Sequence, residues 1–293
     1  MTTNDQPVDP PVRPRPPILR ALGRKEPPAE IDIDGKTYRL ERVVKHDSWA
    51  ATAFYAGDGQ QIVCKFNRQK SIGLMPMRWL GWWLGRREAF ALRLLSGLAG
   101  IPRGMGEVRV AGRPLSYAVA HEFISGRPLR RHDHVSKEVF ADFEKLMAEV
   151  HRRGMAYVDL HKRENILLGE DGRLYLLDFQ VCFFMHNWWP ANSLPARIIL
   201  KLLQGSDRYH LGKHYTHCVL GKHSAGPLGE RPGEHVPQRP LLIRVHRFIA
   251  QPLRALRRWL LVKLGVRSGR GRVETEYFPE EVVRVNREAD RAA

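Results

Sequence analysis

The chain has 293 residues and an ordinary apolar content, which allows one large domain or two small lobes around a hydrophobic core. Its formal net charge of +17 is high, and it favours an anionic partner such as a nucleotide, a nucleic acid or an acidic membrane surface. Three scattered cysteines exclude a disulfide framework, and since we find neither a secretory signal nor an apolar run of about 18 residues, we expect a cytoplasmic protein.

The first part of the chain predicts an arm followed by a small sheet. Residues 1–29 are rich in Pro and Arg and predict a disordered or extended arm. From residue 31 onward, short alternating apolar runs are separated by turns at Asp34-Gly35 and Asp58-Gly59. This pattern predicts an antiparallel sheet with strands in the ranges 31–40, 43–44, 51–55, 61–66 and 116–124.

A tryptophan-rich stretch leads into a predicted helix at 86–95. It combines three aromatic rings with three cations, namely Trp79, Trp82, Trp83, Arg78, Arg86 and Arg87. Two interpretations remain open: either these side chains lie at a lipid headgroup boundary, or the aromatic rings pack on the sheet.

A helix and a hairpin follow. One apolar stripe predicts an amphipathic helix that ends at Gly154, and its members are Val139, Phe140, Phe143, Leu146, Met147 and Val150. Two apolar strands at 166–168 and 174–177, joined by an Asp171-Gly172 turn, then predict a hairpin. This hairpin brings three oxygen-bearing side chains to one edge, where they suit magnesium and a phosphate: Asp159, Asn165 and Asp178.

The last part of the chain predicts helices and a basic tail. A helix is expected at 196–203, and Ser206-Asp207 is expected to cap another. Helical spacing of His210, His214, His217 and Cys218 suits zinc, but a helix at the edge of the core is the preferred interpretation. The range 239–272 carries ten Arg or Lys residues and no acid, with one apolar helical face. It either contacts an anionic membrane or packs under the large lobe, and no groove-reading motif favours nucleic acid.

The polar residues can be assigned to phosphoryl transfer, which needs a cation on the phosphates, acids that hold magnesium and an orienter for the hydroxyl. Lys65 lies in an alternating strand and is expected to hold the phosphates, and Glu88 on the next helix is expected to pair with it. Asp159 would orient the acceptor hydroxyl, while Asn165 and Asp178 would hold the metal. Backbone groups of three further residues would meet adenine: Glu122, Phe123 and Ile124.

The order of these segments resembles the protein-kinase-like superfamily. The strand motif Ile62-Val-Cys-Lys65 is similar to that of the family, as are Glu88, the hinge-like stretch 120–129, the catalytic-loop-like stretch 157–168 and Leu177-Asp-Phe-Gln180. The resemblance implies an α+β, bilobal fold with ATP and Mg²⁺ as cofactors. It implies a β-sheet N-lobe at 30–124, a mainly α-helical C-lobe at 125–225 and a basic amphipathic tail at 226–293.

Several departures from the kinase pattern restrict the resemblance to certain kinase families. No glycine-rich loop precedes the lysine strand, although Ser48 is placed to help bind phosphate, and Gln180 stands where glycine is typical. Asn165 follows Asp159 by six positions, one more than usual, and no Ala-Pro-Glu motif follows Asp178. Such trimmed kinases resemble the lipopolysaccharide (Kdo or heptose) kinases and the RIO-type atypical kinases. The resemblance also suggests that Asp207 supports the catalytic loop.

The sequence therefore leads to three alternatives. The preferred one is an ATP-dependent kinase that phosphorylates a sugar hydroxyl of an envelope glycolipid and contacts the inner face of an anionic membrane. The second is a RIO-like serine/threonine protein kinase with a protein acceptor. The third is a nucleotide-binding pseudokinase or scaffold, favoured by the missing glycine-rich loop and opposed by the presence of Lys65, Glu88, Asp159 and Asp178.

Overall fold

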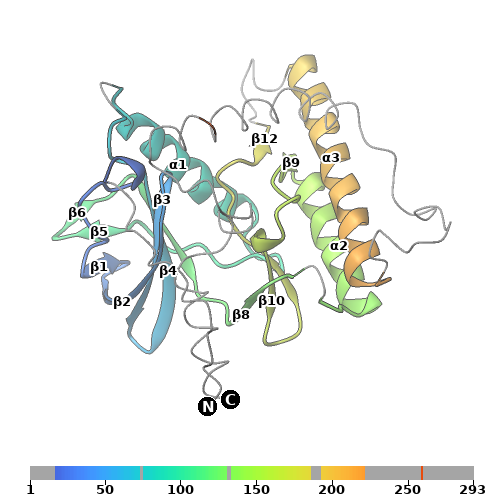
Figure 1. Ribbon diagram of the computed structural model, residues 1–293, viewed down its shortest axis with the longest axis horizontal. Helices are drawn as coiled ribbons and strands as arrows, with labels where there is room; N and C mark the ends of the chain where they lie inside the picture. Colours follow the sequence, from blue (N-terminus) through green and yellow to red (C-terminus); the bar gives the residue numbers. More distant parts are fainter. Residues whose placement is uncertain (1–16, 73–74, 131–132, 186–192, 222–258, 260–293) are drawn as a thin grey trace, which may run out of the picture.

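The computed structural model describes residues 17–72, 75–130, 133–185, 193–221 and 259 (Figure 1). The fold is α+β, with a curled antiparallel sheet and three long helices. Among the described residues, no helix is long and apolar enough to cross a membrane. The predicted tail at 226–293 lies outside the described residues except for Trp259, as does the first half of the predicted arm.

The main sheet has seven antiparallel strands in the order β6-β5-β1-β2-β3-β4-β7. Their bounds are Glu30–Ile33 (β1), Lys36–His46 (β2), Ala50–Gly57 (β3), Gln60–Asn67 (β4), Arg109–Val110 (β5), Arg113–Pro114 (β6) and Ala118–Glu122 (β7). The β1–β2 turn takes positive φ at both Asp34 (51°) and Gly35 (76°), and the β3–β4 turn does so at Asp58 (53°) and Gly59 (69°). Two consecutive residues of positive φ give the turn whose twist suits a tight hairpin. The predicted sheet is confirmed.

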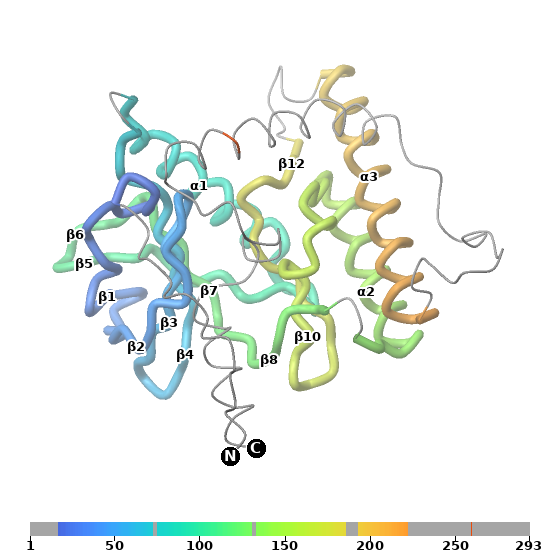
Figure 2. Tube along the Cα trace, viewed as in Figure 1, coloured from blue at the N-terminus to red at the C-terminus, as the bar shows by residue number. Residues whose placement is uncertain are grey.

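Figure 2 traces the strands of the curled sheet. The sheet has its own apolar core, which follows from the alternation in β3 and β4. Alternate residues of these neighbouring strands face the same side and are buried: Ala51, Ala53, Tyr55, Ile62, Cys64 and Phe66. Because successive strand residues point to opposite faces, Val63 and Lys65 face away from this core. The pattern thus places one ammonium group on the other face of the sheet.

A second apolar core lies among the helices α1 (Arg78–Leu94), α2 (Lys137–Arg152) and α3 (Leu194–Cys218). The Ser136 hydroxyl caps α2 by accepting from the Val139 N–H at 3.3 Å. The predicted stripe of α2 is confirmed, since Phe140, Phe143 and the residues that follow at helical spacing are buried. The predicted helix at 86–95 is confirmed in type, but α1 begins earlier, at Arg78.

Two small sheets and two 3₁₀ turns complete the described fold. The bounds are Gly126–Pro128 (β8), Met155–Ala156 (β9), Ile166–Gly169 (β10), Leu174–Leu176 (β11), Phe183–Phe184 (β12), Pro17–Leu19 (η1) and Arg163–Asn165 (η2). Strands β10 and β11 pair antiparallel around Gly172, whose φ is 76°. The predicted hairpin is therefore confirmed.

Two predictions of local structure are wrong. The predicted arm does not extend to residue 29, because Ala21 is buried and its carbonyl accepts from the N–H groups of Gln69 and Lys70 at 2.8 and 2.9 Å. The chain does not break before Ser206, because α3 continues through Gly205 and Asp207 as one helix. Ser206-Asp207 has the composition of a helix cap, but tertiary contacts of Asp207 hold the pair inside the helix.

A pair of glycine substitutions tests this packing. At Gly81 of α1 an added Cβ would lie 2.0 Å from the Arg68 carbonyl oxygen, whereas at Gly205 of α3 it would meet no atom within 4 Å. We expect Gly81→Ala to destabilise the fold by roughly 1–3 kcal/mol, because backbone atoms must shift.

Gly205→Ala is the matched control, and its higher helix propensity should stabilise the fold by roughly 0.5–1 kcal/mol. Urea unfolding of both variants measures the difference. Equal stabilisation by the two substitutions would contradict the close approach of α1 to the end of β4.

Candidate functional site

Lys65 lies at the centre of the candidate site, where it joins three segments of the chain. Its Nζ lies 3.0 Å from Oε1 of Glu88 on α1 and 2.8 Å from Oδ1 of Asp178, which follows β11. The side chains are 14%, 3% and 34% exposed, respectively, so only Asp178 retains substantial contact with solvent. The predicted pairing of Lys65 with Glu88 is confirmed, and the second carboxylate completes a three-membered ion cluster.

The charges of this cluster depend on one another. Burial alone would lower the pKa of Lys65, but the carboxylates of Asp178 and Glu88 raise it well above its usual value. Burial raises the pKa of Glu88, although Lys65 opposes the shift. At Asp178 burial acts in the same direction, but the Lys65 ammonium outweighs it and the pKa is lowered. Lys65 therefore stays cationic, and Asp178 stays anionic, at neutral pH.

Asp159 lies in a loop whose polar groups converge on its carboxylate. Oδ2 of Asp159 lies 2.7 Å from Nζ of Lys162 and accepts from Nδ2 of Asn165 at 3.2 Å. Oδ1 lies 3.3 Å from Nδ1 of His161. Asp159 and Asn165 are predicted from the sequence, whereas Lys162 and His161 are not, although both stand within three positions of Asp159 in a polar run.

Asp207 of α3 holds the backbone just before Asp159 by hydrogen bonds, in line with the role that the kinase-like resemblance suggests. Its side chain is fully buried and accepts from the N–H groups of Tyr157 at 2.7 Å and Val158 at 2.9 Å. It also lies 3.1 Å from Nε2 of His151. One carboxylate thus satisfies two backbone donors next to Asp159, including that of Val158, whose φ is 71°.

The segment around Asp178 is tied both to the Asp159 loop and to the sheet. The Leu177 N–H donates to the Asn165 carbonyl at 2.9 Å, which brings the segments of the two acids together. The buried amide of Gln180 donates to Oδ1 of Asn67 at the end of β4, and Nδ2 of Asn67 donates to the Tyr117 carbonyl at 3.0 Å. A glycine at position 180, as the kinase pattern has it, could not make this link, so Gln180 ties the Asp178 segment to the end of β4.

Ser48 is directed away from the ion cluster. Its hydroxyl donates to the Leu19 carbonyl at 3.0 Å, and its own carbonyl accepts from Arg68. The adjacent loop N–H groups of Trp49 and Ala50 both donate to Oδ1 of Asp47, at 2.7 and 2.9 Å. The predicted phosphate contact of Ser48 would therefore require these bonds to break.

The three residues assigned to adenine differ in how many of their backbone groups are already bonded. The Glu122 N–H donates to Arg103 and its carbonyl accepts from His121, while the Phe123 N–H donates to Gln61. Ile124 makes no hydrogen bond among the residues that the structure describes. Of the three, Ile124 is best placed to offer both backbone groups to a base.

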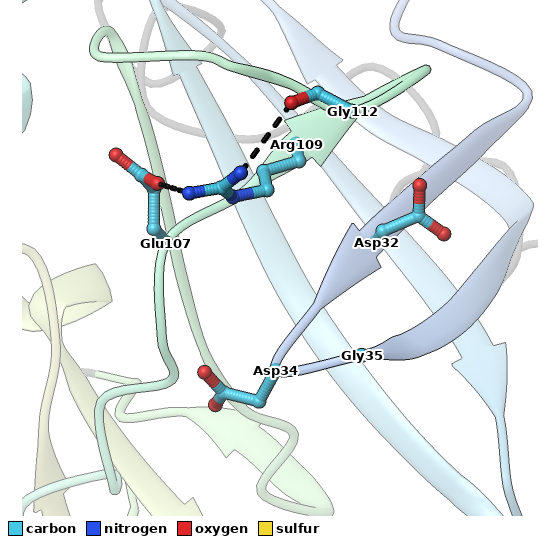
Figure 3. A pocket seen from close by; sticks show the side chains of 6 residues that line it. All are labelled: Asp32, Asp34, Gly35, Glu107, Arg109 and Gly112. Carbon is cyan, nitrogen blue, oxygen red and sulfur yellow. Dashed lines mark hydrogen bonds and ion pairs between the residues drawn. The ribbon is translucent and has the colours of Figure 1, made fainter.

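Two surface hollows lie elsewhere. The first lies at the β1–β5 edge and has a volume of about 410 Å³. Figure 3 shows its lining, in which Arg109 bonds Glu107 (2.7 Å) and Asp32 and Asp34 lie nearby. The second, of about 480 Å³, adjoins the start of α1 and is lined in part by Trp79. Neither hollow is lined by a residue of the ion cluster.

Among the described residues, no group of three or more His, Cys, Asp or Glu side chains could hold a metal by itself. His214, considered for zinc, instead lies with its Nε2 2.7 Å from the Leu160 carbonyl, one residue after Asp159. Magnesium commonly takes one or two carboxylates and completes its shell with water and substrate phosphates. Asp178 and the amide oxygen of Asn165 fit that smaller requirement.

Comparison with known proteins adds little. No protein-family model matches the chain. An alignment over 111 residues is 36% identical to the probable SapB synthase of Streptomyces coelicolor. It takes in 32% of this chain and 12% of that protein, so the chain spans only a small part of its relative.

The buried histidines predict a stability that depends on pH. Burial lowers the pKa of His121, His210 and His214 to about 4 in each case. Between about pH 6.5 and pH 4 the unfolded chain binds protons that the folded chain does not. The free energy of unfolding therefore decreases as the pH is lowered through this range. The expected loss is roughly 1.4 kcal/mol per pH unit for each histidine.

Proton NMR of the folded protein can follow each ring separately, alongside urea unfolding at several pH values. His214 should remain neutral at pH 5. A His214 midpoint near its ordinary value would contradict the burial of this ring against Leu160.

A double-mutant cycle tests the link between Gln180 and Asn67. We expect Gln180→Ala to lower the free energy of unfolding by about 1–3 kcal/mol, since it leaves a buried amide oxygen without its donor. With Asn67→Ala also present, the effect should be smaller by about 0.5–3 kcal/mol. Gln61→Ala, which removes an exposed amide, is the control and should change stability by less than about 0.5 kcal/mol. Strict additivity would show that the two amides do not interact.

Proposed function

We propose that the protein is an ATP-dependent kinase of the protein-kinase-like type, with the curled sheet as its N-lobe and the helical core as its C-lobe. The observation that carries this proposal is the contact of Lys65 with both Glu88 and Asp178. It unites a strand lysine, a helix glutamate and an acid after a hairpin, which is the arrangement that kinase chemistry requires. The resemblance in segment order supports the same assignment.

Lys65 would bind the phosphates of ATP, and Glu88 would fix the direction of its ammonium. Because Lys65 also contacts Asp178 at 2.8 Å, the cation stands beside the acid proposed to hold magnesium. Magnesium, when bound with ATP, would neutralise the phosphate charge and align the terminal phosphoryl group. Asp178 and Asn165 are the residues proposed to hold it.

Asp159 would orient the acceptor hydroxyl and accept its proton. Since Lys162 and Asn165 both engage Oδ2, the Oδ1 atom, with His161 at 3.3 Å, is the one proposed to meet the hydroxyl. Lys162 would also place a second positive charge close to the transferred phosphoryl group. The bond from the acceptor oxygen to phosphorus forms as the bond to ADP breaks, and the hydroxyl proton passes to Asp159.

For the acceptor, we propose a sugar hydroxyl of an envelope glycolipid, such as a lipopolysaccharide core sugar. Only residues 179–193 separate Asp178 from α3, which leaves little chain for a peptide-docking platform. The net charge of +17 favours a polyanionic acceptor or surface. The protein would then act from the cytoplasm at the inner face of the membrane.

Substitution of the two proposed catalytic acids provides the first test. We expect Asp178→Asn to slow phosphoryl transfer roughly 100- to 1000-fold, because magnesium loses a charged ligand. Asp159→Asn should slow it by roughly 100- to 10,000-fold, because the proton loses its acceptor. Asp142→Asn, an exposed acid on α2, makes the same chemical change and should leave the rate unchanged.

Transfer from radiolabelled ATP would be measured at saturating magnesium, with thermal unfolding as the check on folding. An unchanged rate in Asp178→Asn would disprove the mechanism. ATP binding without transfer to any acceptor would identify a pseudokinase instead.

The acceptor is tested by incubating the protein and labelled ATP with a cell extract and its membranes. We expect label in the glycolipid fraction, released as a phosphosugar by mild acid. Label in protein, stable to lipid extraction, would favour the RIO-like alternative. The Asp178→Asn variant in parallel distinguishes this protein's activity from that of kinases in the extract.

A further inference from the structure

The exposed large apolar side chains are gathered on a few segments. Within the described residues, and apart from Trp259, they occur at positions 18, 49, 72, 75–83, 181 and 194–202. They are Ile18, Trp49, Ile72, Met75, Trp79, Trp82, Trp83, Val181, Leu194, Ile198, Ile199 and Leu202. Trp79 is 60% exposed and Leu194 is 71% exposed. Scattered apolar side chains need no explanation, but a contiguous group marks an interaction surface.

At one end, contacts with Arg68 bring three of these segments together. The Arg68 N–H donates to the Trp49 carbonyl at 2.9 Å, and its guanidinium donates to the Ile18 carbonyl at 2.9 Å. The Arg68 carbonyl lies against Gly81 of α1, where no side chain could fit. The segments that carry Ile18, Trp49 and the α1 tryptophans are therefore neighbours in the fold.

Arg87 extends this group of segments from α1 toward β12. Its guanidinium lies 4.5 Å from the ring centroid of Trp83 and 4.6 Å from that of Phe184, and it donates to the Cys182 carbonyl. The exposed Val181 comes just before Cys182 and β12 in the chain, and α3 is the next helix after β12. The N-terminal ends of α1 and α3 both lie along the upper edge of Figure 1, on either side of β12. We call this set of exposed residues the apolar face.

The charged residues in the α1 and α3 parts of the apolar face are basic. No acid occurs from Arg68 to Arg87, and none occurs from 193 to 206, where Arg197 and Lys201 are exposed. The hollow of about 480 Å³ also opens here, lined by Arg78, Arg113 and the rings of Trp79 and Trp82 among others. Two guanidinium groups beside two indole rings suit a phosphate-bearing group at an apolar boundary.

We propose that the apolar face docks on an anionic phospholipid bilayer, with the α1 tryptophans at the headgroup level and a lipid phosphate in the hollow between Arg78 and Arg113. The docking of this face would bring the protein to a membrane-borne acceptor, and that link rests on the proposed function. Val181 lies three residues after Asp178, so docking would bring the bilayer to the side of the molecule that bears the candidate site.

Charge argues against the two occupants that this chain could itself provide. A second copy would set one basic face against another in a protein of net charge +17. The basic segment 239–272 has ten Arg or Lys residues and no acid, so it would add positive charge to a positive surface. Nucleic acid would satisfy the arginines but leave Leu194, Ile198 and Leu202 exposed, whereas a bilayer accommodates both.

Vesicle sedimentation of the full chain, without ATP, tests the proposal. The vesicles are phosphatidylcholine alone or phosphatidylcholine mixed with phosphatidylglycerol. We expect binding only to the mixed vesicles, with Arg78→Gln weakening it roughly fivefold. The double variant Trp79→Ala/Trp82→Ala should weaken it at least about tenfold. Arg173→Gln, on the β10–β11 turn, removes the same charge elsewhere and should bind as the wild type does.

Binding that is unchanged in both face variants would overturn the proposal, and so would equal binding to the two kinds of vesicle. Dimers that dissociate in the tryptophan variant would assign the face to a second copy. Because these measurements need no catalysis, a vesicle-binding protein without kinase activity would refute only the proposed function. An active kinase that does not bind vesicles would refute only the docking face.

Discussion

A buried ammonium group held between two carboxylates sets the position of the sheet relative to the helices. Lys65 belongs to the strand beside the sheet core, whereas Glu88 and Asp178 belong to segments that flank the helical core. Leaving such a charge without its partner costs about 3–5 kcal/mol, so the three segments must stay in register. The cluster therefore links two apolar cores that would otherwise be joined mainly by β7 and α1.

The two acids of the site stand at or beside strained backbone. Val158, just before Asp159, has φ of 71°, and Asp178 has φ of 59°. A β-branched or acidic residue in this region costs about 1–3 kcal/mol, so neighbouring contacts must hold it there. Asp207 does so at Val158 by accepting its N–H, and Lys65 does so at Asp178 through the ion pair. The same contacts that offset the strain also orient the acids.

Local pattern was sufficient to predict the hairpins, the α2 stripe and the order of the polar residues. Alternation in β4 predicted the direction of Lys65, and its pairing with Glu88 followed from the next helix. Pattern failed where a distant partner decides the outcome. Ser206-Asp207 has the composition of a cap, yet the bonds of Asp207 to Tyr157 and Val158 keep it within α3.

The same limit applies to the contacts of Ser48 and to the extent of the arm. Nothing near Ser48 in the sequence indicates that its hydroxyl bonds Leu19, which lies 29 positions away. Likewise, composition alone suggested disorder up to residue 29, but Ala21 is buried and the carbonyl of Ile18 accepts from Arg68. Gln180 shows the opposite: it departs from the kinase motif, yet its amide bonds Asn67 and so ties the Asp178 segment to the end of β4.

The helix α1 connects the candidate site with the apolar face. Adjacent helical residues point about 100° apart, so Glu88 reaches inward to Lys65 while Arg87 lies beside Trp83 and Phe184. A surface that bound the tryptophans would therefore act on the same helix that carries Glu88, the partner of Lys65. Such binding changes the site only if it favours one position of α1 over another. Arg87 also donates to the carbonyl of Cys182, four residues after Asp178. A shift of α1 would therefore also move the segment that carries the Asp178 carboxylate.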